Sequence, residues 1–330
     1  MKKFYDCSNS SEAPSHHKEN NGPSTNDIVC GLKKYCHIFG WECVKKAKSA
    51  DLLFTNDVYP KRFDKLDKPR VKRMDGVYWD EYLVERNIPL NKAATQSDWV
   101  IFISKYSQDA YYKLYGDKLQ NDKVILNCVD DTVYFPLDRG EPKDPHVLVA
   151  SASNWIRDQK RWSDLMAFMV DVAPEYTLHL IGECGMLDVP ENVIEHGYIE
   201  DEKEVNEIMN KAKYMINFAY RDAAPKVVCQ AVNCRLPVFY ADSGGTGELV
   251  DAGVGVLDEA AFDIIDRIPP LDSESIQEGW VRFLASQNML TEEAKYTRHN
   301  FMNMLSAYFD TFDRTLNHHL LQQLGKRRMS

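Results

Sequence analysis

Long apolar runs are absent from the sequence. No stretch is long and apolar enough to cross a bilayer, and the first residues, MKKFYDCSNSSEAPSHHKENNG, have two lysines but no apolar segment after them. We therefore expect neither a membrane-spanning helix nor a secretory signal, and we expect the protein to act in the cytoplasm. Positive charge is also in short supply, because 40 Lys and Arg stand against 50 Asp and Glu, a net charge of −10. This balance argues against tight nonspecific binding to nucleic acid or to an anionic membrane.

Zinc-binding cysteine pairs are also missing. The chain has eight cysteines, and their spacings match no C-x2-C template. Their positions are Cys7, Cys30, Cys36, Cys43, Cys128, Cys184, Cys229 and Cys234. Because no secretory signal is expected, disulfides are not expected either. The pattern predicts reduced thiols that are mostly buried.

What is present is an alternation of strand and helix patterns over 330 residues. A single core rarely grows beyond about 250–300 residues, so the length indicates two domains. A polar segment with three prolines, residues 130–145, is the expected linker. In the first half, helical spacing of apolar residues predicts helices at 27–40, 85–97 and 105–115. The expected strands there are residues 2–6, 51–55, 70–74, 99–104 and 123–128.

The second half continues the alternation. Strands separated by helices predict βαβ units and a parallel sheet, with ligands bound at the carboxyl ends of its strands. A final amphipathic segment, residues 291–322, predicts one long helix or a pair, followed by a loose basic tail. We expect domains at 1–140 and 141–290, with 291–330 as terminal helices. The expected strands of this half are 146–151, 177–182, 192–197, 213–219 and 237–241, and the helices between them are 161–173, 201–212 and 225–234.

Residues 220–250 contain features that suit an anion. Pro225 stands where a helix begins, and the amides near Lys226 and Val227 at such a helix start attract a diphosphate. Asp222 and Gln230 can both face the same crevice. Strand–proline–helix turns also occur in many α/β proteins without a ligand, so an ordinary turn is an equal alternative for this segment alone.

A second polar cluster follows the strand expected at 146–151. The loop after it holds Asn154, Arg157, Lys160 and Arg161, and such a group of cations suits a phosphate-bearing ligand. A solvated basic loop is the equal alternative when the segment is considered by itself.

The order of these motifs resembles that of the retaining glycosyltransferases of family 4. The resemblance covers residues 95–257 well and residues 1–94 loosely. The matching segments are NCVDDTVYFP (127–136), SASNWIRDQKRW (151–162), LHLIGECG (178–185), NVIEHGYIEDE (192–202), and the stretch from Asp222 through NCRLPVFYADSGGTGELV (233–250).

The resemblance implies a GT-B fold, with two Rossmann-like domains whose parallel sheets face a central cleft and a C-terminal helix that crosses back. The domain at 1–140 would bind the acceptor and the domain at 141–290 the donor. The implied activity is retaining transfer from a nucleoside diphosphate sugar, such as a UDP- or GDP-sugar, to a glycan or another hydroxyl acceptor. Since such enzymes generally work without a bound metal, and no DXD-type string lies in a suitable loop, we expect no metal and no cofactor.

The resemblance also implies residue roles in the second domain. Lys160 and Arg157 would hold the donor diphosphate together with the amides of Lys226 and Val227. Asp222 occupies the position that meets the transferred sugar, and Gln230 occupies that of the carboxylate that binds ribose. The other predicted donor-site residues are Tyr198 and Ile199, which would cradle the base, and Asn154, Gly182 and Pro225.

Two positions depart from the family pattern. Gln230 is an amide where a carboxylate is usual, and a hydrogen bond to a neutral group is worth about 0.5–1.5 kcal/mol against about 1.5–3 kcal/mol for a charged one. Asp222 replaces the commoner Glu. These exchanges leave room for a different donor, or for a nucleotide-sugar-binding protein of the same fold with weakened catalysis.

In the first domain, the resemblance points to a cleft loop and a catalytic carboxylate. The loop contains Gly22, Pro23 and Ser24, ahead of the first helix. Asp75 follows an expected strand, and we predict that it faces the reacting centre; an Asp that caps its own turn is the alternative. A DNA-base-modifying glycosyltransferase is a further alternative, which would need a basic groove at KPRVKRM (68–74) and which the acidic balance disfavours.

Overall fold

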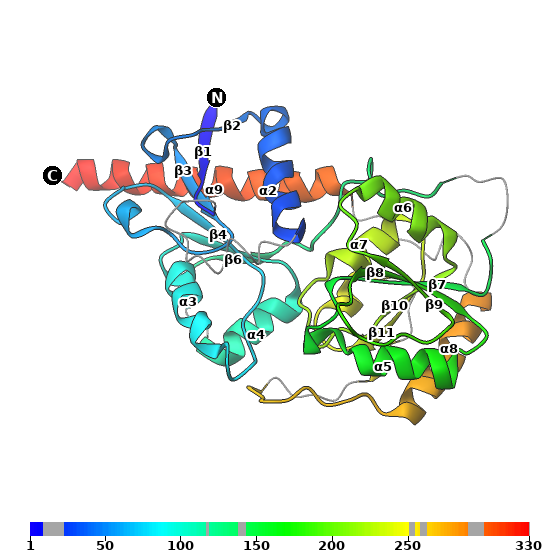
Figure 1. Ribbon diagram of the computed structural model, residues 1–330. Coiled ribbons are helices and arrows are strands. Elements are labelled where there is room, and N and C mark those ends of the chain that lie inside the picture. Colours follow the sequence, from blue (N-terminus) through cyan, green and yellow to red (C-terminus); the bar gives the residue numbers. More distant parts are fainter. Residues whose placement is uncertain are drawn as a thin grey trace. The chain divides into compact units, whose positions relative to one another are not determined.

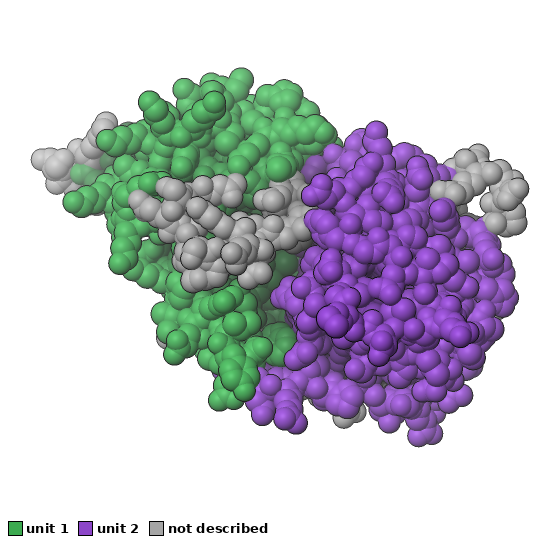
Figure 2. Space-filling model, in the orientation of Figure 1, with its two compact units in different colours: residues 1–126, 302–330 green, residues 127–301 purple. Residues whose placement is uncertain are grey.

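The chain folds into two compact units (Figures 1 and 2). The computed structural model describes residues 1–8, 23–116, 119–137, 143–250, 255–257, 263–289 and 300–329. Unit 1 comprises residues 1–126 and 302–330, and unit 2 comprises residues 127–301. Each unit contains a six-stranded parallel sheet, so the predicted α/β class is confirmed. Within the described parts of the chain, none of the helices has the length and apolarity to cross a membrane.

The sheet of unit 1 has the strand order β2-β1-β3-β4-β5-β6, and every neighbouring pair is parallel. Strands β1 and β4 have the predicted bounds, whereas β6 is shorter than predicted. The three-residue β2 was not predicted, because so short a run has no periodicity to detect. The bounds are β1 Lys2–Asp6, β2 Trp41–Cys43, β3 Leu52–Thr55, β4 Arg70–Met74, β5 Trp99–Phe102 and β6 Asp122–Val124.

The helices of unit 1 follow the predicted order. Helix α2, Pro23–Tyr35, begins earlier than predicted and continues as a 3₁₀ turn, Cys36–Phe39, which ends at Gly40 with φ 75°. Helix α3 spans Asn87–Thr95. Helix α4, Lys105–Tyr115, has the predicted bounds.

Helix α4 begins at a reciprocal cap. The Ser107 amide donates to the Ser104 hydroxyl oxygen at 3.0 Å, and the Ser104 amide donates to the Ser107 oxygen at 3.2 Å. These bonds satisfy amides that a helix start leaves without intrahelical partners, which is why the helix begins here.

Helix α9, Phe301–Met329, brings the chain back to unit 1 (Figure 1). It is one helix, and it includes the basic tail predicted to be loose; residues 290–299 lie outside the described part. Phe309 and Phe312 pack on Phe4 of β1, with ring centroids 6.1 and 5.5 Å apart. The apolar residues whose spacing predicted this helix therefore form the face that covers the sheet of unit 1.

The sheet of unit 2 has the strand order β12-β11-β10-β7-β8-β9, again all parallel. Strand β12 and helix α8 were not predicted. The strands are β7 Val147–Asn154, β8 Thr177–Glu183, β9 Val193–Gly197, β10 Tyr214–Asn217, β11 Val238–Asp242 and β12 Val256–Leu257. The helices are α5 Trp162–Ala167, which continues as a π-helical turn at Phe168–Val172, α6 Glu202–Lys211, α7 Lys226–Asn233 and α8 Ser273–Met289.

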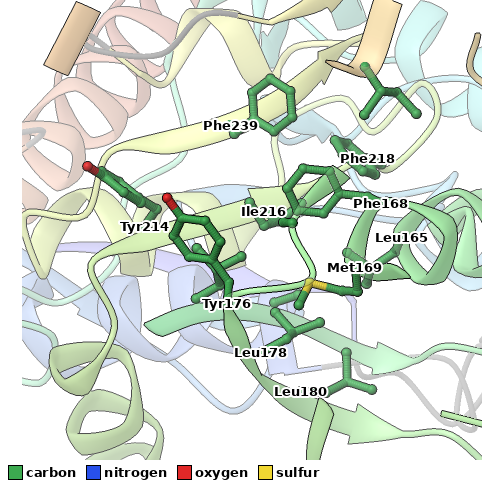
Figure 3. Close-up of a cluster of buried hydrophobic side chains, with 14 of the residues drawn as sticks. Leu165, Phe168, Met169, Tyr176, Leu178, Leu180, Tyr214, Ile216, Phe218 and Phe239 are labelled. Atoms are coloured by element: carbon green, nitrogen blue, oxygen red, sulfur yellow. The ribbon is translucent and has the colours of Figure 1, made fainter. Parts of the chain in front are cut away.

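An aromatic cluster fixes α5 and α8 to one face of this sheet (Figure 3). Phe168 is fully buried, and its ring lies 5.8 Å from that of Phe239 on β11 and 5.2 Å from that of Trp280 on α8. Leu178 and Leu180 reach the same cluster from alternate positions of β8. Since alternate strand residues point to the same face, this packing fixes which residues of β8 face the core. It thereby fixes the register of the sheet from which the site loops leave.

Candidate functional site

The candidate site of unit 2 lies where the strand order reverses. Strand β7 has β8 on one side and β10 on the other, so the loops that follow β7 and β10 run to opposite sides of the sheet. In open parallel sheets, ligands bind at the carboxyl ends of the strands beside such a reversal. The loop after β7 contains Lys160, and the loop after β10 contains Asp222.

Lys160 and Asp222 meet across this point. The Lys160 Nζ donates to Asp222 Oδ2 at 3.0 Å, and the two side chains are 15% and 23% exposed. An ammonium group that remains partly accessible beside a helix start is suited to an anionic ligand. The structure thus brings together two residues that lie 62 positions apart in the sequence and that were both predicted for the site.

Backbone contacts hold the two loops and the turn after β11 together. The Tyr220 amide donates to the Gln159 carbonyl at 2.8 Å, and the Gly245 amide donates to the Asp222 carbonyl at 2.8 Å. Gly244 has φ 85°, and a Cβ there would lie 2.3 Å from the Asp222 carbonyl oxygen. The turn can approach Asp222 this closely only with glycine at position 244.

Helix α7 begins beside the pair. Pro225 is its N-cap, with φ −65°, rather than its first helical residue as predicted. Among the described residues the Val227 amide makes no hydrogen bond, as is usual for a first-turn amide. The Lys226 Nζ lies 3.3 Å from Glu202 Oε1 of helix α6. The helix start therefore offers an amide, a helix dipole and a nearby cation.

Gln230 lies one turn further along α7. It is buried, with 6% of its surface exposed, and its side-chain amide has no hydrogen bond to the described part of the chain. The neighbouring Cys229 thiol donates to the Asn127 carbonyl at 3.5 Å, which ties α7 to the start of unit 2. Gln230 therefore keeps hydrogen-bonding capacity that a ligand can use.

Residues near the end of β7 are arranged differently from the prediction. Asn154 is the last residue of β7 rather than a loop residue, and its Oδ1 accepts from the Ile156 amide at 2.8 Å. Arg157 is exposed and precedes the 3₁₀ turn that contains Lys160. The longer strand arises because residues 152–154 continue beside β8 after an irregularity in the register.

The glycine predicted at the end of β8 has a packing role. Gly182 has φ 125°, and a Cβ there would lie 1.7 Å from the Ala152 carbonyl oxygen. The Trp155 indole donates to the Ile181 carbonyl at 3.0 Å beside it. This close approach of β7 and β8 requires glycine at position 182.

Tyr198 and Ile199 follow the end of β9. Tyr198 is 50% exposed and Ile199 is partly buried. Strand β9 is the edge strand of the sheet, and β8 and β7 separate it from β10. Their proposed contact with the base therefore stays a prediction.

In unit 1, Asp75 follows the carboxyl end of β4. It forms an ion pair with the Arg73 guanidinium, and the Asp75 side chain is 41% exposed whereas that of Arg73 is 2% exposed. Burial acts to lower the pKa of Arg73, but Asp75 and Tyr308 of α9 outweigh it and leave that pKa raised. That Asp75 faces the reacting centre stays a prediction. Of the predicted cleft loop, Gly22 lies outside the described residues, and Pro23 and Ser24 are the first residues of α2.

Two of the four cations in the basic run at 68–74 are buried. Lys72 and Arg73 are 0% and 2% exposed. The Lys72 Nζ donates to the carbonyls of Asp57 and Arg73 at 2.6 and 3.3 Å, and burial lowers its pKa to about 8. Lys72 and Arg73 are thus used inside unit 1 and are not available to a nucleic acid.

Most of the cysteines lie in the interior of the structure. All eight cysteines are free, and six of them are buried, as predicted. Burial raises the pKa of Cys128, Cys184 and Cys234 to about 12. Among the residues the structure describes, no group of three His, Cys, Asp or Glu side chains could hold a metal ion.

Three further residues lie next to the ion pair, and of these the sequence pointed only to Arg161, as one of the cations in the loop after β7. Arg161 follows Lys160, while Tyr220 and Arg221 precede Asp222, and all three are buried. Arg161 and Arg221 have positive φ values of 52° and 46°. For Tyr220 and Arg221, the only signal in the sequence was their position next to Asp222.

Comparisons with known proteins bear on the fold. No family model matches the sequence, and no curated protein matches it. Solved structures do match. Sucrose-phosphate synthase from Thermosynechococcus elongatus is similar with a TM-score of 0.61 and 15% identity, over 98% of this chain and 89% of that one. HepE from Anabaena, in complex with UDP and glucose, is similar with a TM-score of 0.62 and 14% identity, over 95% and 99%.

A third structure agrees with these two. WaaG, a glycosyltransferase involved in lipopolysaccharide biosynthesis, has a TM-score of 0.60 and 12% identity, over 94% of this chain and 95% of that one. The fold is GT-B. The GT-B prediction is therefore confirmed, and the activity has to be argued from the site, because one fold serves many functions.

Proposed function

We propose that this chain is a glycosyltransferase that uses a nucleoside diphosphate sugar as its donor. The observation that carries the proposal is the Lys160–Asp222 ion pair, 3.0 Å long, at the strand reversal of unit 2. A cation for a diphosphate and a carboxylate for sugar hydroxyls stand together there. Among the structures of similar fold are HepE complexes with UDP and with UDP-glucose, which supports a donor of this class.

The chemistry requires a stabilised leaving diphosphate. In our proposal Lys160 exchanges its contact with Asp222 for a phosphate oxygen, and the start of α7 adds the Val227 amide and the helix dipole. Arg157 is exposed and can approach the same anion from solvent. Once the donor is bound, these groups face the diphosphate, so little further reorganisation is needed as negative charge develops on the leaving group.

Asp222 would bind hydroxyl groups of the transferred sugar once Lys160 has moved to the diphosphate. Gln230 would accept from and donate to the ribose, since both of its amide atoms are available. We further propose that transfer to a hydroxyl acceptor retains the anomeric configuration. Nuclear magnetic resonance of the first-formed product distinguishes retention from inversion.

The test is ligand stabilisation followed by turnover. UDP-, GDP- and ADP-glucose are each added to the protein, and the unfolding midpoint is measured; a ligand at 100 times its dissociation constant stabilises by about 2.7 kcal/mol. We expect one nucleotide to raise the midpoint in the parent protein and to have no effect on Lys160→Ala.

A matched control separates this site from general charge effects. Lys105→Ala removes an exposed lysine of α4 that is also paired with an aspartate, and it should respond to the nucleotide like the parent. No stabilisation of the parent by any nucleotide sugar would overturn the proposal. Stabilisation without hydrolysis or transfer to any acceptor would instead favour the binding-only protein of the same fold.

A further inference from the structure

Two buried arginines contact one buried tyrosine next to the Lys160–Asp222 pair. The guanidinium carbons of Arg161 and Arg221 lie 4.8 and 4.9 Å from the centre of the Tyr220 ring. These distances are within the range of a cation–π interaction. Tyr220 is fully buried, and each arginine is 5% exposed. We call these three residues the arginine clamp.

Both arginines of the clamp are held from a second side. The Arg161 Nη2 donates to the Pro269 carbonyl at 2.9 Å, and the Arg161 Nε lies 3.6 Å from Asp164 Oδ2. The Arg221 Nη1 donates to the Asp263 carbonyl. These two carbonyls belong to residues 263–271, a segment that precedes α8 and that we call the strap.

The strap is itself anchored. Its Leu271 amide donates to Asp164 Oδ2 at 3.2 Å, and the Leu271 side chain is buried in the core of unit 2. Asp164 therefore joins the first turn of α5 to the strap and to Arg161 at once. Through the strap and Asp164, the clamp links the loops after β7 and β10 to the core of unit 2.

The backbone of both arginines is strained. Left-handed φ values of 52° at Arg161 and 46° at Arg221 cost about 1–2 kcal/mol each for a residue with a Cβ, and glycine would avoid that cost. Such strain persists where the surroundings hold it in place and is concentrated at functional sites. In both loops the strained residue is next to the one predicted to touch the donor.

We propose that Arg161 and Arg221 are positioning residues for donor binding. Acting through Tyr220, they hold the loops after β7 and β10 in place, so that the Lys160 ammonium and the Asp222 carboxylate keep their relative positions. The donor part of this inference rests on the proposed function.

The first experiment measures UDP affinity by calorimetry. Arg221→Met removes the guanidinium but keeps an unbranched side chain of similar reach, and we expect the dissociation constant for UDP to rise about tenfold. Arg235→Met is the matched control, because Arg235 is also at positive φ, 56°, but is exposed at the end of α7. The control should bind UDP like the parent.

A double-mutant cycle shows whether the effect passes through Lys160. In a Lys160→Ala background, Arg221→Met should change UDP affinity by less than about twofold, because the group that it positions is gone. An equal loss of affinity in both backgrounds, or no loss in the parent background, overturns the positioning role.

The second experiment needs no ligand and therefore separates the clamp from the proposed function. Trace acetylation by acetic anhydride, read by mass spectrometry, reports how accessible the Lys160 amine is. We expect Lys160 to be modified several-fold faster in Arg221→Met and at the parental rate in Arg235→Met. Parental labelling of Lys160 in folded Arg221→Met overturns the proposal.

The two results can fail separately. If UDP does not bind the parent, the proposed function fails while the labelling still decides whether the clamp positions Lys160. If Arg221→Met does not fold, Arg221→Lys keeps the charge but loses the planar group that stacks on Tyr220, and the same labelling is expected to be faster. Labelling of Lys160 at the parental rate in Arg221→Lys likewise overturns the proposal.

Discussion

The Lys160 ammonium that we propose for the donor diphosphate is bound to the Asp222 carboxylate, 3.0 Å away. Both side chains are largely buried, so the pair is shielded from solvent and from screening by salt. An incoming diphosphate must compete with Asp222 for the same amine, and its negative charge is repelled by that carboxylate. Asp222 would thus weaken diphosphate binding while serving the transferred sugar.

This competition predicts opposite effects of one substitution on binding and on transfer. Asp222→Asn removes the competing charge and leaves Lys160 short of a partner, so we expect UDP to bind about tenfold more tightly by calorimetry. Transfer from the intact donor should fall by about 100-fold or more, because the sugar loses a charged hydrogen-bond acceptor. Asp109→Asn, which breaks an exposed ion pair of α4, is the control and should change neither quantity. Weaker UDP binding to Asp222→Asn would contradict the competition.

Gln230 gives a second prediction. Gln230→Glu restores the carboxylate of the family pattern, and the difference between a neutral and a charged hydrogen bond, about 1 kcal/mol, predicts about fivefold tighter UDP binding. The same change should lower the unfolding midpoint of the unliganded protein, because a buried carboxylate without a partner is costly. Calorimetry measures the UDP affinity, and thermal unfolding measures the midpoint.

Gln287→Glu is the matched control for this prediction. Gln287 lies on α8 and is 7% exposed, close to the 6% of Gln230. It should lower the unfolding midpoint without improving UDP binding. If Gln230→Glu binds UDP no better than the parent does, Gln230 does not contact the ribose.

The elements around Lys160 and Asp222 were predictable because local signals mark them. Apolar runs such as HVLVAS and KYMINFA indicate buried strands, and Pro225 marks the start of α7. The pairing of Lys160 with Asp222 follows from the reversal in strand order, which the βαβ pattern alone does not specify. The polar loops singled out both residues, and the resemblance to a known family, rather than periodicity, gave them their roles.

Other features carried no usable local signal. Strands β2 and β12 are three and two residues long, too short for periodicity to appear. The roles of Arg161 and Arg221 depend on contacts that join segments distant in sequence, because Arg161 meets Tyr220 and both arginines meet the strap. Lys72 and Arg73 looked like a basic surface because sequence shows charge but not burial, and only the packing of β4 showed that both are enclosed.

The turn at Gly244 allows a prediction about strain and contact together. Gly244 and Gly40 have similar φ values, 85° and 75°, but a Cβ at Gly244 would lie 2.3 Å from the Asp222 carbonyl oxygen, whereas one at Gly40 meets nothing within 4 Å. Gly40→Ala should therefore cost about 1 kcal/mol in the free energy of unfolding, from backbone strain alone. Gly244→Ala should cost about 2–4 kcal/mol and should also weaken UDP binding, since Asp222 and its loop must shift. Denaturant unfolding measures the free-energy cost of each variant. Equal costs for the two variants would show that a Cβ at position 244 does not clash with Asp222.

A histidine pair in unit 2 predicts how stability depends on pH. The His179 Nδ1 lies 2.8 Å from His196 Nε2, and their rings are stacked with centroids 5.0 Å apart. Burial, then the neighbouring ring and Lys211 of α6, lowers the pKa of His179; burial and Lys211 lower that of His196, against a smaller opposing effect of Glu204. At this distance the two nitrogens can share one proton, but protonation of both rings would place two cations in contact.

Because both folded pKa values lie below the ordinary histidine value of 6.5, the unfolded chain binds more protons as the pH falls. The stability contributed by the neutral pair is therefore fully present above pH 6.5 and is lost as the pH falls towards the folded pKa values. We expect the unfolding midpoint of unit 2 to drop between about pH 7 and about pH 5, and to drop less in His196→Gln, which keeps a polar partner that does not ionise. The exposed His37→Gln in unit 1 is the control and should keep the parental slope. An unchanged slope in His196→Gln would show that the stacked pair does not set the response to acid, and that the loss of stability arises from other groups.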